Sequence, residues 1–150
     1  MKVAITGKGG VGKTTLASTL ARLYADEGRT VLAADVDPDA NLGLAVGLSQ
    51  EEVDAIVPIS KMRTLVEERT GATDANRFYK LNPYVADIPE KYSKDINGVK
   101  LLVMGTVDVG GSGCVCPEHV MLKSILAALT FRKDDVVIMD MEAGLEHLGR

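Results

Sequence analysis

The chain has 150 residues, of which 46% are hydrophobic and 25% are charged, so its length and composition suit one globular domain. A net charge of −4 and an aromatic content of 4% argue against a nucleic-acid groove, because such grooves are basic and often offer aromatic rings for stacking. No stretch approaches the roughly 18 uninterrupted apolar residues of a membrane span, and no signal peptide is visible. We therefore expect a cytoplasmic protein that binds neither nucleic acid nor membrane.

The strongest motif lies near the N-terminus, where the sequence Gly-Lys-Gly-Gly-Val-Gly-Lys-Thr fits G-x-x-x-x-G-K-[ST], the Walker A or P-loop pattern. Glycines let the main chain curl around an anion, so that backbone N–H groups can cradle nucleotide phosphates. Lys13 brings a positive charge to the outer phosphates, and the Thr14 hydroxyl can bind Mg²⁺. The predicted nucleotide-binding residues are Gly7, Lys8, Gly9, Gly10, Val11, Gly12, Lys13, Thr14 and Thr15.

The segments on either side of the loop match the context that this motif requires. Residues 3–6 form a short apolar run, which is typical of a buried parallel strand. Residues 14–27 follow with Leu16, Leu20 and Leu23 on one helical face, and Gly28 is a C-terminal stop signal. The order strand, loop, helix favours a nucleotide site over a glycine-rich surface turn.

A second strand is expected over residues 30–35, and it ends in acidic residues. Strand, helix and strand in this length form a βαβ unit, so the two strands should be parallel, though not necessarily neighbours. Ligands of such sheets bind outside the carboxyl ends of the strands, which places Asp35 and Asp37 at the same edge as the P-loop. We predict that Asp35 holds Mg²⁺ through water and that Asp37 orients the attacking water; a solvated acidic turn is the alternative.

The middle of the chain is less informative. Ser49 and Glu52 form a capping-box pattern, so a short helix should begin near Gln50, and a second helix is expected over about residues 61–69. Residues 71–97 are polar and poorly periodic, and we interpret them as a connection without chemistry. A third strand is expected over residues 99–104, followed by a helix from Pro117 to about residue 131.

A fourth strand is expected over residues 136–140, where an apolar run ends in Asp140. This is the form of a Walker B strand, whose terminal carboxylate reaches the Mg²⁺ shell. Gly144 follows four residues later, where a backbone N–H could contact a γ-phosphate. Beside a Walker A loop, this combination predicts a complete site for Mg²⁺ and phosphate.

The two cysteines of the chain, Cys114 and Cys116, precede the predicted helix at residue 117. The helix dipole there favours thiolate and should lower the pKa of the thiols. Thiolates are suitable ligands for Zn²⁺ or a comparable soft metal, which is usually bound by about four ligands. One chain offers two thiolates, so two copies related by a two-fold axis would together offer four. The sequence thus favours a metal-bridged homodimer; ordinary free cysteines and a strained redox disulfide are the alternatives.

Lys8, inside Gly-Lys-Gly-Gly-Val-Gly-Lys-Thr-Thr, makes the loop resemble the deviant Walker A loop of the MinD and nitrogenase iron-protein group. The resemblance implies an ATPase in which Lys8 crosses a nucleotide-bridged dimer to the phosphates bound by the partner, as an arginine finger does. It also implies that Lys8, Lys13 and Asp37 are the catalytic residues and that Thr14 binds Mg²⁺. The implied fold is α/β, a P-loop NTPase with a mostly parallel sheet flanked by helices.

Within that group, Cys-Val-Cys-Pro-Glu and the segment that begins at Asp140 are most similar to the CooC-type ATPases. The resemblance implies a maturation factor that assists nickel insertion into carbon monoxide dehydrogenase, with Ni²⁺ or Zn²⁺ on Cys114 and Cys116 at the dimer interface. A partitioning ATPase like MinD or ParA and an iron–sulfur ATPase like the nitrogenase iron protein are the alternatives. The preference for ATP or ADP over guanine nucleotides also rests on the resemblance. Relatives continue past the Walker B strand, so we expect residues 1–150 to be the N-terminal part of a longer P-loop ATPase domain.

Overall fold

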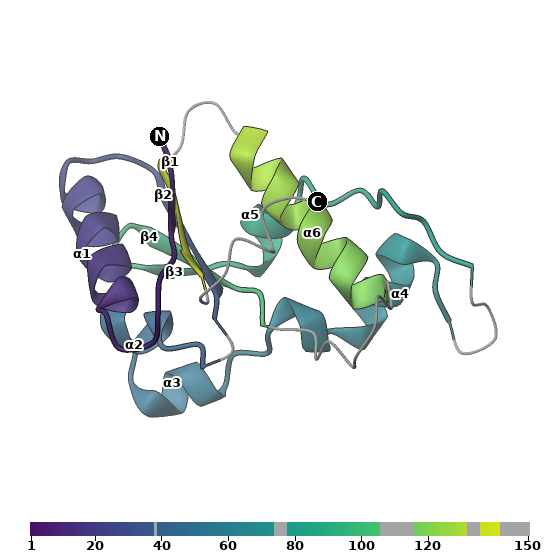
Figure 1. The fold of residues 1–150 in the computed structure, drawn as a ribbon, viewed down its shortest axis with the longest axis horizontal. Helices are drawn as coiled ribbons and strands as arrows, with labels where there is room; N and C mark the ends of the chain where they lie inside the picture. The colour runs from purple at the N-terminus through teal and green to yellow at the C-terminus, as the bar shows by residue number, and fades with distance from the viewer. Residues whose placement is uncertain (38, 74–77, 106–115, 132–135, 142–150) are drawn as a thin grey trace.

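In the computed structural model, which describes residues 1–37, 39–73, 78–105, 116–131 and 136–141, the chain folds around a five-stranded sheet (Figure 1). The strand order is β1-β5-β2-β4-β3. The pairs β1·β5, β5·β2 and β2·β4 are parallel, and β3 joins β4 in an antiparallel pair. The strands are β1 (Lys2–Ile5), β2 (Val31–Val36), β3 (Lys94–Ile96), β4 (Val99–Val103) and β5 (Val136–Met141).

Helices cover both faces of the sheet, which lies edge-on between them in Figure 1. One face carries α1 (Lys13–Asp26), α2 (Leu42–Val46) and α3 (Gln50–Asp54). The other carries the 3₁₀ turn η1 (Ile59–Lys61), α4 (Arg63–Thr70), α5 (Ile88–Tyr92) and α6 (Pro117–Phe131). This arrangement confirms the predicted α/β fold with a mostly parallel sheet flanked by helices.

The central strands are buried along their whole length because both of their faces are covered. In β2, Val31 and Ala33 belong to the core under α1, while Leu32, Ala34 and Val36 belong to the core under α6. All six residues of β5 are buried, and its five apolar residues divide between the same two cores. A parallel strand covered on both faces needs such a continuous apolar run, which is why β2 and β5 were recognisable in the sequence.

Helix α1 forms where it was predicted, but it packs through a different face. Leu16 and Leu23 are 52% and 55% exposed, whereas Ala17 and Ala21 are fully buried against the sheet. The small alanines let the helix lie close to the strands, and this close approach leaves no room for leucine at those positions. The predicted leucine stripe is therefore not the main packing face of the helix.

Two expectations about the middle of the chain are wrong. Residues 71–97 include α5 and β3 as well as connecting chain, and β3 raises the number of strands above the four that were predicted. Asn97 and Gly98 join β3 to β4 with φ values of 51° and 86°. Positive φ at both positions is typical of the tight type I′ hairpin turn that Asn-Gly favours. That dipeptide was the available signal for the hairpin.

The short helix α2, directly after the acidic loop, was also not predicted. The capping box at Ser49 and Glu52 is present, and α3 begins at Gln50 as expected. Helix α6 begins and ends at the expected residues, with Pro117 in its first position. Among the helices in the described ranges, none is long and apolar enough to cross a membrane.

Candidate nucleotide-binding site

The P-loop leaves β1 and leads directly into α1. Gly10 and Gly12 have φ values of 77° and 89°, a region in which residues with a Cβ are strained. Gly12 is also the N-cap of α1, and no side chain caps the N–H groups of this 14-residue helix. Uncapped N–H groups and the helix dipole together make this end of α1 suited to phosphate.

Lys13 folds back over the loop. Its Nζ lies 3.5 Å from the carbonyl oxygen of Lys8, a long hydrogen bond, and 4.0 Å from Oδ2 of Asp37. Its side chain is only 10% exposed. Lys8 is exposed, which suits a residue expected to act on a partner.

The strand order brings the acidic residues to the P-loop. Strand β5 lies between β1 and β2, so the carboxyl end of β5 adjoins the ends of both neighbours. Asp140 of β5 is paired in register with Ile5 on one side and with Asp35 on the other. The predicted Walker A and Walker B segments therefore meet at one edge of the sheet.

Asp140 is a buried carboxylate whose oxygens accept no hydrogen bond in the described part of the chain. Burial raises the pKa of Asp140, while the nearby Thr14 hydroxyl opposes this rise. An unpaired buried carboxylate is costly unless a cation shares its site. Carboxylate and hydroxyl oxygens are ligands that Mg²⁺ prefers, so Asp140 and Thr14 fit a Mg²⁺ site.

Asp35 is fully buried as well, but its two oxygens are occupied. Oδ1 accepts a hydrogen bond of 3.2 Å from the amide of Asp37, and Oδ2 accepts one of 3.0 Å from the amide of Leu42. Burial is the main cause that raises the pKa of Asp35 to about 7; the two amide hydrogen bonds oppose it. The role of Asp35 as a ligand of Mg²⁺ stays a prediction.

Asp37 is half-buried and stands between the P-loop and the start of α2. Its Oδ1 accepts a hydrogen bond of 3.0 Å from the amide of Asp39, and its Oδ2 faces Lys13. A carboxylate held at the end of the P-loop lysine is well placed to contact water near a terminal phosphate. This geometry is compatible with the predicted role of Asp37, which stays a prediction.

The predicted metal site at the cysteines is only partly visible, because Cys114 lies outside the described residues, as does Gly144. Cys116 is half-buried immediately before α6. Burial raises the pKa of its thiol, the amide of His119 opposes this, and Glu118 adds to the rise. The expected lowering by the helix dipole is therefore wrong for Cys116. Within the described ranges, no three His, Cys, Asp or Glu side chains are grouped to hold a metal.

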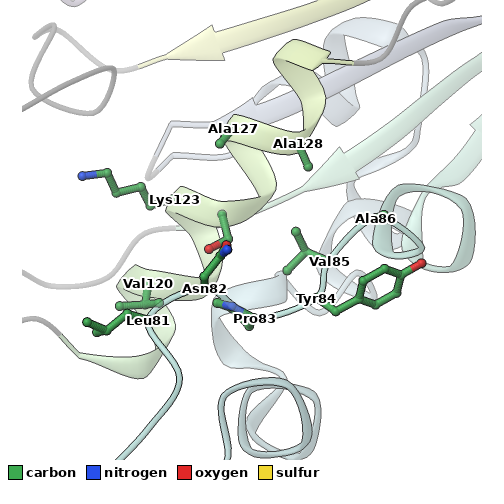
Figure 2. A pocket seen from close by; sticks show the side chains of 11 residues that line it. Leu81, Asn82, Pro83, Tyr84, Val85, Ala86, Val120, Lys123, Ala127 and Ala128 are labelled. Carbon is green, nitrogen blue, oxygen red and sulfur yellow. The ribbon is translucent and has the colours of Figure 1, made fainter.

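A separate hollow lies on the opposite face of the sheet from α1, between residues 81–86 and α6 (Figure 2). It measures about 640 Å³ and is lined mostly by apolar side chains such as Pro83, Val85 and Val120, with Lys123 at its side. It shares no residue with the P-loop or with the acidic strand ends. The hollow is therefore separate from the predicted phosphate site at the carboxyl edge of β1, β5 and β2.

Comparison with known proteins places this site among nucleotide-binding relatives. The chain is 52% identical, over 100% of its length, to the carbon monoxide dehydrogenase accessory protein CooC of Rhodospirillum rubrum, of which it covers 57%. It is 51% identical to an uncharacterized ATP-binding protein of Methanocaldococcus jannaschii, covering 100% of this chain and 58% of that protein. The chain thus spans well under two thirds of the length of these curated relatives.

Solved structures share the fold. Cobyrinic acid a,c-diamide synthase from Mycobacterium smegmatis, solved with bound ADP and magnesium, matches with a TM-score of 0.57 and 28% identity, covering 98% of this chain and 53% of that one. The cell division protein MinD of Aquifex aeolicus matches with a TM-score of 0.52 and 24% identity, covering 97% of this chain and 48% of that one. Residues 2–108 match the family described as the CobQ/CobB/MinD/ParA nucleotide binding domain, and the chain belongs to this family.

Proposed function

We propose that the protein is a Mg²⁺-dependent ATPase that works as a homodimer and assists nickel insertion into carbon monoxide dehydrogenase or a related nickel enzyme. The observation that carries this proposal is the 52% identity to the accessory protein CooC over the whole of this chain. The family supports nucleotide binding in general. Hydrolysis, the dimer, the metal and a cytoplasmic location are parts of the proposal.

In the proposed site, the P-loop binds the phosphates of ATP. The uncapped N-terminus of α1 offers N–H groups, and Lys13 supplies a positive charge from a half-buried position. Phosphate oxygens can replace the two oxygens that Lys13 now faces, on Lys8 and Asp37, because a phosphate carries more negative charge. The Asp37 carboxylate, 4.0 Å from Lys13, would lie beside the place where water must attack.

Thr14 and Asp140 are the residues that would hold Mg²⁺, as the unpaired oxygens of Asp140 suggest. When bound, Mg²⁺ neutralises charge on the phosphate oxygens as the bond to the terminal phosphate breaks. Asp37 accepts a hydrogen bond from the attacking water and orients it. The exposed Lys8 reaches the phosphates bound by the partner, so that hydrolysis depends on the dimer.

The nickel ion is the cargo of the proposed reaction. Cys114 and Cys116 of each copy would together offer four thiolates at the two-fold axis, which suits Ni²⁺ or Zn²⁺. The Cys116 thiol has a raised pKa in the single chain, so binding of a metal there should release a proton. Opening and closing of the ATP-dependent dimer would then control uptake and release of the ion.

Changing Cys114 and Cys116 to serine tests the proposal. Because serine is a poor ligand for soft metals, we expect the double variant to lose the bound metal and to form a weaker dimer. Metal content is measured by mass spectrometry on the purified protein, with and without ATP and Mg²⁺, and dimer mass by light scattering. ATP hydrolysis by the wild type is measured in the same preparations.

The matched control is Ser112→Ala, a change of similar size in the same segment, which should leave metal content and dimer mass unaltered. If the double cysteine variant keeps both its metal content and its dimer mass, the proposed metal-bridged dimer is refuted. Visible absorption typical of an iron–sulfur cluster after anaerobic purification would instead favour an electron-transfer ATPase. If the wild-type protein hydrolyses no ATP, the proposed ATPase activity is refuted.

A further inference from the structure

Two buried aspartates lie side by side at the carboxyl edge of the sheet, yet their surroundings differ. Asp35 and Asp140 are paired in register on β2 and β5, and both are fully buried. Both oxygens of Asp140 lack a hydrogen bond within the described residues. Both oxygens of Asp35 accept one from a backbone amide, at 3.2 and 3.0 Å. Only Asp140 thus has both oxygens free for a cation.

The two amides that Asp35 binds stand at opposite ends of one loop. Oδ1 binds the amide of Asp37, where the chain leaves β2, and Oδ2 binds the amide of Leu42, the first residue of α2. The N-cap residue of α2, Asn41, makes no side-chain hydrogen bond to the helix. The carboxylate of Asp35 therefore caps α2 in place of Asn41, and it closes the loop between its two contacts.

The enclosed loop carries Asp37, and it is held in a shape that needs support. Ala40 has a φ of 46°, which is unfavourable for a residue with a Cβ, and its amide donates to the carbonyl oxygen of Asp37. Asp39 donates its amide to Oδ1 of Asp37. With the loop closed in this way, Oδ2 of Asp37 lies 4.0 Å from Nζ of Lys13.

Each oxygen of Asp35 has one lone pair left after its amide contact, so a metal bound there would share the oxygen with that amide and draw negative charge away from the hydrogen bond. Losing either contact would leave a backbone N–H without its partner, which costs on the order of 1–3 kcal/mol at a buried position. We propose that Asp35 is a positioning residue, which fixes the loop so that Asp37 stands over the P-loop lysine, and that it is not a ligand of Mg²⁺. This proposal rests on the ATP hydrolysis proposed above, in which Asp37 orients the attacking water.

The substitution Asp35→Asn separates the two roles. The carboxamide keeps the size of the side chain and one acceptor oxygen, but its NH₂ group cannot accept the second amide. We expect kcat for ATP hydrolysis to fall by about tenfold or more, since a misplaced water-orienting group slows the chemical step. The half-saturating Mg²⁺ concentration and the dissociation constant for ADP should change by less than about twofold, because neither involves Asp37 positioning.

Asp39→Asn is the matched control: it removes one charge from an exposed side chain in the same loop, and kcat should stay at the wild-type value. An unchanged kcat in Asp35→Asn would overturn the positioning role. A large rise in the half-saturating Mg²⁺ concentration in Asp35→Asn would overturn the statement that Asp35 is not a ligand.

A measurement on the wild type needs no variant to fold. Hydrogen exchange at the amide of Leu42 should stay slow when Mg²⁺ and ADP are added, because Asp35 keeps both contacts. Faster exchange at Leu42 on adding Mg²⁺ would overturn the proposal. This measurement does not require turnover, so it tests the contacts of Asp35 separately from hydrolysis. If the wild type hydrolyses no ATP, only the proposed ATPase activity is refuted.

Discussion

At the scale of single residues, Asp140 is a buried carboxylate that the fold leaves without a hydrogen bond among the described residues. A carboxylate with no exposed surface and no hydrogen bond among the described residues destabilises the sheet on its own. The neighbouring Thr14 hydroxyl only partly opposes the rise in the pKa of Asp140, and a cation held by both groups would supply the missing positive charge. Removing the charge of Asp140 should therefore increase the stability of the protein without ligand and decrease its affinity for Mg²⁺.

Asp140→Asn tests this opposition. The variant should raise the half-saturating Mg²⁺ concentration for ATP hydrolysis by about tenfold or more, since one charged ligand is lost. Without Mg²⁺ and nucleotide, its free energy of unfolding should increase by on the order of 1 kcal/mol, because an uncompensated buried charge is removed. Urea titrations and hydrolysis assays over a Mg²⁺ series measure the two effects.

The control is Asp26→Asn, which neutralises an exposed carboxylate at the end of α1; it should leave the Mg²⁺ requirement unchanged, and any gain in stability from the helix dipole should be the same with and without Mg²⁺. A lower stability of Asp140→Asn in the absence of Mg²⁺ would show that Asp140 has a structural partner. An unchanged Mg²⁺ requirement in Asp140→Asn would show that Asp140 is not a ligand of Mg²⁺.

At the scale of elements, the segments with strong local signals were predictable. Pro117, at the first helical position, indicated where α6 begins. The apolar runs of β2 and β5 predicted strands that are covered on both faces. The short elements α2 and β3 were missed, because five or three residues show no clear periodicity. Their formation depends on tertiary partners, such as the carboxylate of Asp35 for α2 and the neighbouring β4 for β3.

The same contrast applies to the site. The glycines, Lys13 and Asp140 were recognisable because phosphate binding constrains residue type and spacing. The difference between Asp35 and Asp140 could not be predicted, because both are acidic residues at the end of an apolar strand. It depends on which amides the folded chain brings to each carboxylate, and that is a property of the loop and of α2.

The segment before β3 is attached to α4 by an ion pair whose pH dependence is testable. Arg69 of α4 donates two hydrogen bonds to Asp87, at 3.0 and 2.8 Å, and Lys91 adds a third contact. Arg69 above all, and then Lys91, hold the pKa of Asp87 well below its usual range. Because the folded state binds this proton more weakly than the unfolded state, the pair stabilises the fold above about pH 4 and loses its effect as pH falls.

We therefore expect Asp87→Asn to lower the free energy of unfolding at pH 7, and the difference from the wild type should shrink as pH falls below about 4. Urea titrations over a pH series measure it. Glu67→Gln is the control, since Glu67 forms an ion pair of 2.7 Å with the largely exposed Arg63 and the change should have a smaller effect at pH 7. A difference between Asp87→Asn and the wild type that is independent of pH would contradict the assignment.

At the scale of the whole molecule, the order of the strands brings the predicted site residues of one chain together. Inserting β5 between β1 and β2 collects the P-loop, Asp35 and Asp140 at one edge. In the proposed function these residues serve the nucleotide bound by their own chain, whereas Lys8 is exposed. Two copies that face each other across bound ATP would place each Lys8 near the phosphates held by the other copy.

Lys8→Ala tests this arrangement. Since the lysine acts on the partner, the variant should keep ATP binding within about twofold but lose ATP-driven dimerisation, and kcat should fall by about a hundredfold or more, as on removing an arginine finger. Light scattering with ATP and Mg²⁺ and a hydrolysis assay measure the two effects. Lys61→Ala, at an exposed lysine in η1, is the matched control and should dimerise normally. Normal dimerisation of Lys8→Ala would confine Lys8 to its own chain, and the shared site would have to be abandoned.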